Sequence, residues 1–154
     1  MTITIRNLSE ASEKQSVVRQ VLEALPDWFA IEEGREAYIR ESAGQICFGA
    51  YSAQQCVGFL CLKQTGNVTA ELAVMGVLQP FHRLGIGRKL FEAAKAKARA
   101  LGFSFIQVKT VQMGMYPDYD ATNRFYLSLG FQEFEVLPTL WDEANPCQIY
   151  IMAI

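Results

Sequence analysis

The sequence has few of the features that indicate a metal site, a disulfide framework or a membrane segment. Its 154 residues include one histidine, His82, and four cysteines with no C-x-x-C pair, so we expect no metal and buried, reduced thiols. No apolar run approaches the roughly 20 residues that span a bilayer. Polar residues within the first seven positions interrupt any signal peptide. These absences predict a soluble, cytoplasmic chain with no membrane partner.

Basic charge is also scarce, with one local exception. The chain has 14 basic and 16 acidic side chains, a balance that argues against nucleic acid as a partner. Residues 80–110 differ, because they carry seven Lys and Arg side chains against Glu92 alone and lie between two acidic segments. This basic segment is either a solvated helix face or an anion site. The length and the 51% of hydrophobic residues suit a single domain, residues 1–154.

Hydrophobic periodicity predicts a mixed α/β (α+β) fold, with a central mixed sheet flanked by helices. The expected strands are residues 1–6, 45–51, 56–63, 68–77, 103–110, 131–137 and 148–154. The expected helices are residues 9–26, 31–42, 86–101 and 121–129, with residues 111–120 and 138–147 as loops. The central strand–helix–strand unit should make its two strands parallel and adjacent.

A glycine-bearing turn opens the helix inside the basic segment. Gly85 and Gly87 lie where free amide N–H groups and the helix dipole favour an anion. Arg83 and Arg88 can add charge-assisted hydrogen bonds. No G-K-S/T sequence follows, which excludes a Walker loop, and Leu90 stands where a dinucleotide fingerprint needs a third glycine. The turn indicates a phosphate site, although a glycine turn into an amphipathic helix without a ligand has the same pattern.

Two motifs resemble those of a known family. The run from Val77 to Arg88 resembles the acyl-CoA-binding motif Q/R-x-x-G-x-G/A of the GNAT superfamily of N-acetyltransferases, and the run from Arg124 to Phe131 is similar to its later F-Y-x-x-x-G-F segment. They lie about 40 residues apart, and the order of elements agrees over the whole chain. His82 departs from the usual Gln or Arg. We expect this change to be tolerated, because main-chain amides bind the phosphate in this family.

The resemblance implies that acetyl-CoA, with no metal, is the cosubstrate. Its pyrophosphate would lie on the glycine turn, and its pantetheine arm would run beside the preceding strand as an extra strand. A β-bulge is expected to splay that strand, and an amide N–H near Gly76 or Val77 would polarise the thioester carbonyl. The expected cosubstrate-binding residues are Met75, Gly76, Val77, Arg83, Leu84, Gly85, Ile86, Gly87, Arg88 and Asn123.

The resemblance also implies a general base and a general acid. Glu71 matches the position of the base in several family members, and the alternative is a solvent-facing edge position. Tyr126 matches the tyrosine that protonates the coenzyme sulfur, and the alternative is a core tyrosine. No cysteine accompanies either motif with a histidine base, so we expect direct transfer without an acyl-cysteine.

The acceptor pocket should lie among the N-terminal helices and the loops after the later strands. Acidic and aromatic residues gather in these segments, and both suit a cationic amine. The candidate residues are Trp28, Phe29, Tyr116, Tyr119 and Trp141. We expect a small amine-bearing acceptor. The alternatives are a protein acetyltransferase acting on lysine or N-terminal amines and a non-catalytic acyl-CoA-binding module, and a homodimer is left open.

Overall fold

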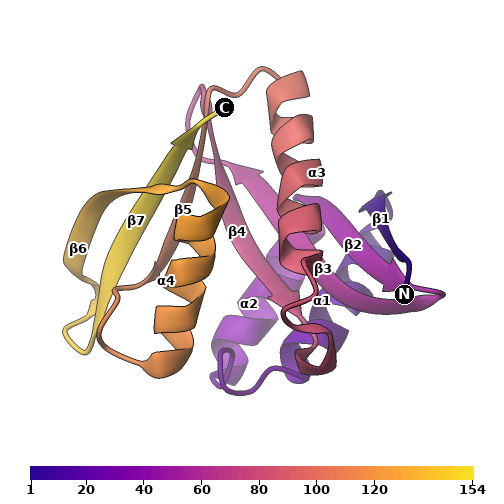
Figure 1. Ribbon diagram of the computed structural model, residues 1–154, viewed down its shortest axis with the longest axis horizontal. Coiled ribbons are helices and arrows are strands. Elements are labelled where there is room, and N and C mark those ends of the chain that lie inside the picture. Colours follow the sequence, from indigo (N-terminus) through magenta and orange to yellow (C-terminus); the bar gives the residue numbers. More distant parts are fainter.

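The computed structural model describes residues 1–154 and has one seven-stranded sheet with helices on both faces (Figure 1). The strands are β1 (Ile3–Leu8), β2 (Ile46–Ser52), β3 (Gln55–Gln64), β4 (Thr69–Val77), β5 (Phe105–Val111), β6 (Gln132–Asp142) and β7 (Asn145–Ala153). The helices are α1 (Ala11–Glu23), α2 (Glu32–Ser42), α3 (Ile86–Ala100) and α4 (Pro117–Leu129), with a short 3₁₀ turn η1 (Gln79–Phe81). No helix combines the length and apolar character that crossing a bilayer requires.

The strand order is β1-β2-β3-β4-β5-β7-β6, and every neighbouring pair is antiparallel except β4 and β5. This confirms the mixed sheet and the parallel strand–helix–strand unit expected from the sequence. Helices α3 and α4 lie on one face, and α1 and α2 lie behind β2, β3 and β4 (Figure 1). The C-terminal strand β7 is inserted between β5 and β6.

Each face of the sheet has its own core. On the α3 side a cluster of 17 buried residues includes Leu90 and Phe91, which lie on the apolar stripe of α3. On the α1 side a cluster of 13 includes Val21 and Leu22. Helix α1 packs closely on β4, because a Cβ at Gly76 would lie 3.1 Å from the Val21 side chain of α1 and 2.9 Å from that of Leu25, just after the helix. Gly76 therefore allows close helix–strand packing at the end of β4.

Helix α4 begins four residues before the expected start at Ala121, inside the segment predicted as a loop. Pro117 occupies the first turn, where a missing N–H costs nothing, and Asp118 and Asp120 favour the positive end of the helix dipole. The residues interpreted as loop formers are thus helix-start residues.

The hairpin of β6 and β7 is also longer than expected, and the predicted loop at residues 138–147 is wrong. Strand β6 continues through Pro138 to Asp142, and β7 begins at Asn145. Proline is tolerated because β6 is the edge strand of the sheet, where an N–H that points to solvent has no partner to lose. The pairing is irregular here, with a register shift between Leu137 and Asp142.

Candidate active site

The turn before α3 presents a run of amide groups without partners. Gly85 is left-handed at φ 78° and Arg83 at φ 63°, and α3 begins at Ile86 with no side-chain cap. The first backbone bond into this turn runs from the Lys89 N–H to the Gly85 carbonyl, 3.1 Å. None of the N–H groups of residues 83–88 donates to a backbone carbonyl. Six consecutive donors at a helix N-terminus form a site that suits a phosphate group.

The side chains of this turn differ in what they contact. Leu84 is exposed, whereas Ile86 is buried in the core, so Ile86 can offer a ligand only its main chain. The Arg88 guanidinium donates to the Ser128 carbonyl, 3.0 Å, and so links α3 to α4. A Cβ at Gly87 would lie 2.9 Å from the Phe125 ring. Gly87 is therefore required for the close approach of α3 and α4, and Arg83 is the basic side chain with no partner in this turn.

His82, which departs from the family motif, connects the turn to two other segments. Its Nε2 hydrogen-bonds the Val77 carbonyl at the end of β4. Because a carbonyl only accepts, Nε2 carries the proton. The imidazole also meets the Trp28 ring edge to face, with centroids 5.8 Å apart. His82 thus holds the turn against both β4 and the segment between α1 and α2.

Strands β4 and β5 separate soon after they begin. They pair only from Thr69 to Glu71 against Phe105 to Gln107, and beyond that point the two ribbons diverge (Figure 1). On its other side β4 carries the expected β-bulge, at Ala73, because Leu72 and Val74 pair with successive residues of β3. The N-terminus of α3 follows the end of β4, so the unpaired amides and the split between the strands belong to one site.

Glu71 lies where the split begins. Its side chain is 9% exposed and accepts a hydrogen bond from the Lys109 ammonium, 2.9 Å. Val108 packs in the α3-side core, so by strand alternation Lys109 and Glu71 point to the opposite face. Burial raises the pKa of Tyr38 on α2, and the nearby Tyr119 and Glu71 add to the rise. The Glu71–Lys109 pair therefore lies at the opening of the split, and the Glu71 charge acts on Tyr38 of α2.

Tyr126 lies on α4 and is 6% exposed. Its ring packs against Phe131 and Tyr150 in the α3-side core, with centroids 5.8 and 6.1 Å away. Burial raises its pKa well above the ordinary phenol value, and Tyr38 adds to the rise although it belongs to α2. Tyr126 thus lies on the α3 side of the sheet, whereas Glu71 faces the α1 side. The phenol remains protonated, and so able to donate, throughout the neutral pH range.

Asn123 is fully buried and its amide is occupied. Its two amide hydrogens are donated to the carbonyls of Val111, 2.8 Å, and Tyr119, 2.7 Å. Its oxygen accepts from the Tyr150 hydroxyl, 2.6 Å. These bonds leave Asn123 no free N–H for the pantetheine arm. Its role in the structure is to fasten α4 to β5 and β7, one helical turn before Tyr126.

The five aromatic residues expected on the acceptor side are only partly brought together. The Tyr119 hydroxyl donates to the Trp28 carbonyl, 3.2 Å, and Phe29 meets Tyr38 edge to face at 6.1 Å. Tyr116 lies against Tyr119, with centroids 6.0 Å apart. Trp141 is 47% exposed on edge strand β6, and no ring contact or hydrogen bond joins it to the others. Tyr116 and Tyr119 therefore form one aromatic pair, which the Tyr119 hydroxyl links to the segment between α1 and α2, and Trp141 lies apart.

Comparison with known proteins identifies the family. A sequence profile described as the acetyltransferase (GNAT) domain matches residues 43–133, which include β4, the glycine turn, α3 and α4. This chain belongs to the GNAT family of acetyltransferases. It is an acyl-CoA-dependent N-acetyltransferase. None of the curated protein sequences compared with it matches.

Solved structures share the whole fold of this GNAT acetyltransferase. A GNAT-family protein from Desulfovibrio desulfuricans has 20% identity and a TM-score of 0.85, with 99% of each chain covered. The ribosomal-protein-S18-alanine N-acetyltransferase from Escherichia coli has 17% identity and a TM-score of 0.77, covering 99% of this chain and 94% of that one. An aminoglycoside 6'-N-acetyltransferase complexed with coenzyme A has 18% identity and a TM-score of 0.77, covering 99% and 97%.

Two site residues of this GNAT acetyltransferase, Lys109 and Tyr38, were not predicted from the sequence. Lys109 is the only charged side chain in an otherwise largely apolar strand, which is the signal that drew attention to Glu71. Tyr38 is an aromatic residue within a highly charged helix. Each pattern marks a residue that is unusual for its strand or helix. Neither pattern shows that Lys109 and Tyr38 both lie near Glu71.

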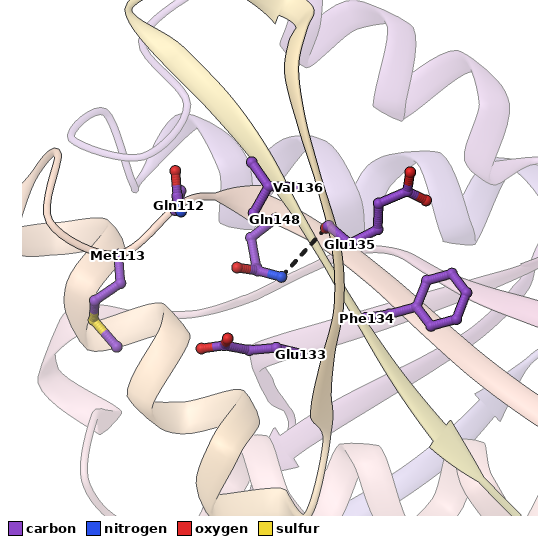
Figure 2. A pocket seen from close by; sticks show the side chains of 7 residues that line it. All are labelled: Gln112, Met113, Glu133, Phe134, Glu135, Val136 and Gln148. Atoms are coloured by element: carbon purple, nitrogen blue, oxygen red, sulfur yellow. Dashed lines mark hydrogen bonds between the residues drawn. The ribbon is translucent and has the colours of Figure 1, made fainter.

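A cavity of about 330 Å³ lies elsewhere, between the end of β5 and the β6–β7 hairpin. Its lining includes Gln112, Glu133 and Gln148, and Figure 2 shows Glu133 and Gln148 pointing into it while Phe134 points away. Gln148 donates to the Glu135 carbonyl, 3.3 Å (Figure 2). None of the predicted site residues lines this cavity. It is separate from the split that contains Glu71.

Proposed function

We propose that this protein, one domain over residues 1–154, transfers an acetyl group from acetyl-CoA directly to the primary amine of a small molecule. The observation that carries the proposal is the run of six unpartnered amides at residues 83–88, which ends beside the split between β4 and β5. The aminoglycoside acetyltransferase of the same fold, which is complexed with coenzyme A, supports acetyl-CoA as the donor.

The cosubstrate is held mainly by backbone groups in this proposal. Its pyrophosphate accepts hydrogen bonds from the amides of Leu84 to Arg88, and Arg83 adds a charge-assisted bond. The pantetheine arm runs along Met75 to Val77, on the side of β4 that has no strand partner beyond Glu71. Asn123 contributes by positioning α4, since its amide has no free hydrogen.

The reaction needs a neutral amine, a polarised carbonyl and a protonated leaving group. The amine nitrogen attacks the thioester carbon, a C–N bond forms, and the C–S bond breaks. Glu71 accepts the proton that the amine nitrogen loses as the C–N bond forms, directly or through a water, and Tyr126 donates its hydroxyl proton to the departing sulfur. An amide of β4 near Gly76 or Val77 hydrogen-bonds the carbonyl oxygen as negative charge develops.

The acceptor enters from the face that carries α1 and α2. In this proposal Trp28, Phe29 and Tyr119 line the approach, because Phe29 contacts Tyr38, whose pKa Glu71 helps to raise. Aromatic rings attract an ammonium group through their electron-rich faces. These side chains come from the segment between α1 and α2, from α2 and from α4.

The test combines calorimetry with a thiol-release assay. Acetyl-CoA binding by the purified protein, together with release of coenzyme A in the presence of one or more small amines, is the expected result. Turnover of lysine peptides or N-terminal peptides but of no small amine would instead establish a protein acetyltransferase. Binding without any turnover would establish an acyl-CoA-binding module, and no heat with any coenzyme A derivative would refute the proposal.

The glycine turn provides a direct test of cosubstrate binding. Gly85→Ala should weaken acetyl-CoA binding about tenfold, because a left-handed non-glycine residue costs roughly 1–2 kcal/mol and the turn relieves the strain by redirecting its amides. Gly102→Ala is the matched control. Gly102 is also left-handed, at φ 90°, with nothing within 4 Å of a Cβ, but lies beyond the other end of α3. Equal acetyl-CoA affinity in the two variants, measured by calorimetry, would contradict this role.

Direct transfer predicts that no cysteine becomes acetylated. All four thiols are buried, and burial raises the pKa of Cys56 and Cys147, so these two stay protonated and poorly nucleophilic. Cys147 lies nearest to the Glu71–Lys109 pair, and Cys147→Ala should retain turnover. Mass spectrometry after incubation with acetyl-CoA alone should show unmodified protein. An acetylated cysteine whose replacement abolishes turnover would establish a covalent route.

A further inference from the structure

The two side chains of the Glu71–Lys109 ion pair, at the opening of the split, differ in solvent exposure. The Glu71 side chain is 9% exposed, whereas that of Lys109 is 31% exposed. One ammonium hydrogen of Lys109 is donated to Glu71, 2.9 Å away, and two others stay free for a further acceptor. A molecule that approaches Glu71 on this face therefore meets a positive group beside the buried carboxylate.

Two of the groups near the pair are neutral, and Glu41 is the other carboxylate close to Tyr38. Tyr38 and Cys147 both lie near Glu71, and burial raises the pKa of each, which keeps them neutral at pH 7. Arg35 is engaged with the carbonyls of Phe29 and Ala30 at 2.9 and 3.3 Å. An amine without a carboxylate leaves the free hydrogens of the Lys109 ammonium without an acceptor and places a second cation beside them.

A zwitterion avoids this conflict. In an α-amino acid the amine nitrogen and a carboxylate oxygen lie about 3 Å apart by standard bond lengths. The Lys109 nitrogen and the Glu71 oxygen are separated by 2.9 Å. The two charges of the amino acid are thus separated by nearly the same distance as those of Lys109 and Glu71. The two pairs can lie side by side, so that each charge faces its opposite.

On this basis, and resting on the proposed function, we propose that the acceptor is a small amine with an adjacent carboxylate, of the α-amino acid class. Lys109 binds the carboxylate, and Glu71 receives the amine and its proton. Lys109 is then the residue that determines acceptor specificity. The proposal narrows the acceptor class from all small amines to those that carry the amine and a carboxylate on the same carbon atom.

The experiment compares each of several α-amino acids with its decarboxylated amine in the thiol-release assay. The measured quantity is the ratio of the two kcat/KM values. For the unmodified protein the ratio is expected to favour the amino acid by about tenfold or more, the effect of one charge-assisted contact. A ratio is used because any effect of a substitution on Glu71 itself acts on both acceptors and cancels.

Lys109→Met should bring this ratio close to one, whereas Lys109→Arg, which keeps the charge, should preserve most of the preference. Lys95→Met is the matched control, because it removes a partly exposed lysine that pairs with Glu92 on α3, and the ratio should not change. Calorimetry with acetyl-CoA shows whether each variant is folded and binds the cosubstrate.

The outcomes separate this inference from the proposed function. Turnover of simple amines as fast as that of amino acids, or an unchanged ratio in Lys109→Met, would overturn the assignment of Lys109 while leaving the acetyltransferase activity on small amines intact. Absence of turnover with every small amine, despite binding of acetyl-CoA, would overturn both.

Discussion

Replacing Tyr126 with phenylalanine is expected to lower kcat by about 100-fold or more, the usual contribution of a positioned general acid. The ring remains in place against Phe131 and Tyr150, so the substitution removes the hydroxyl and little else. Acetyl-CoA affinity should be unchanged, because the proton is needed only when the C–S bond breaks. Steady-state thiol release and calorimetry measure the two quantities separately.

The same variant has a predicted effect on stability at high pH. The folded-state pKa of Tyr126 is raised by burial, so above the ordinary phenol pKa of about 10 the unfolded chain loses the proton while the folded chain keeps it. The stability that Tyr126 contributes is present below that pH and declines as pH rises above it. Between pH 9 and pH 11 the free energy of unfolding of Tyr126→Phe should therefore fall less than that of the unmodified protein, and the difference should be about the contribution of one ionisable group.

A near-normal kcat for Tyr126→Phe would remove Tyr126 from the mechanism.

Glu71→Gln should lower kcat/KM for the amine by about 100-fold near neutral pH, because an amide cannot take the proton from the ammonium form to give the neutral nucleophile. Only the fraction of amine that is already neutral in solution can then react. That fraction grows about tenfold per pH unit below the pKa of the amine, so the loss should shrink as pH rises. A pH profile of kcat/KM for both proteins measures this difference.

Glu92→Gln is the control for breaking an ion pair as such. It separates Glu92 from Lys95, 3.3 Å away on the outer surface of α3, and should leave both kcat/KM and its pH profile unchanged. If Glu71→Gln showed a loss that stays constant with pH, Glu71 would be a structural partner of Lys109 and not the base.

The elements whose signals are local were predictable from the sequence. The strands of the first half and helix α3 follow from apolar periodicity, and the left-handed turn at Gly85 follows from a glycine before a helix. The start of α4 and the length of β6 were not predicted. Pro117 and Pro138 were interpreted as loop residues, but the first lies in an opening helical turn and the second on an edge strand. Whether a proline is tolerated at these two places depends on where the helix begins and on which strand lies at the edge of the sheet. The residues around each proline do not show this.

The residues of the candidate site also fall into those that could be predicted from the sequence and those that could not. Glu71 and Tyr126 could be selected by their residue types and their positions relative to the motifs, and their catalytic roles remain predictions. Their partners could not be selected, because Lys109 reaches Glu71 only through the register of β4 against β5, 38 positions later in the sequence. Asn123 is the converse case. The resemblance implied that it binds the cosubstrate, whereas the packing of α4 on β5 and β7 uses both hydrogens of its amide.

The position of β7 in the sheet has a consequence for the order in which the protein folds during synthesis. Strand β6 pairs only with β7, and β5 pairs with β4 over three residues but with β7 over seven. While the ribosome is still adding residues up to Asp142, both of these strands expose edges that could associate with other chains. The half of the sheet that carries Lys109 is completed only when β7, the last of its strands, has emerged.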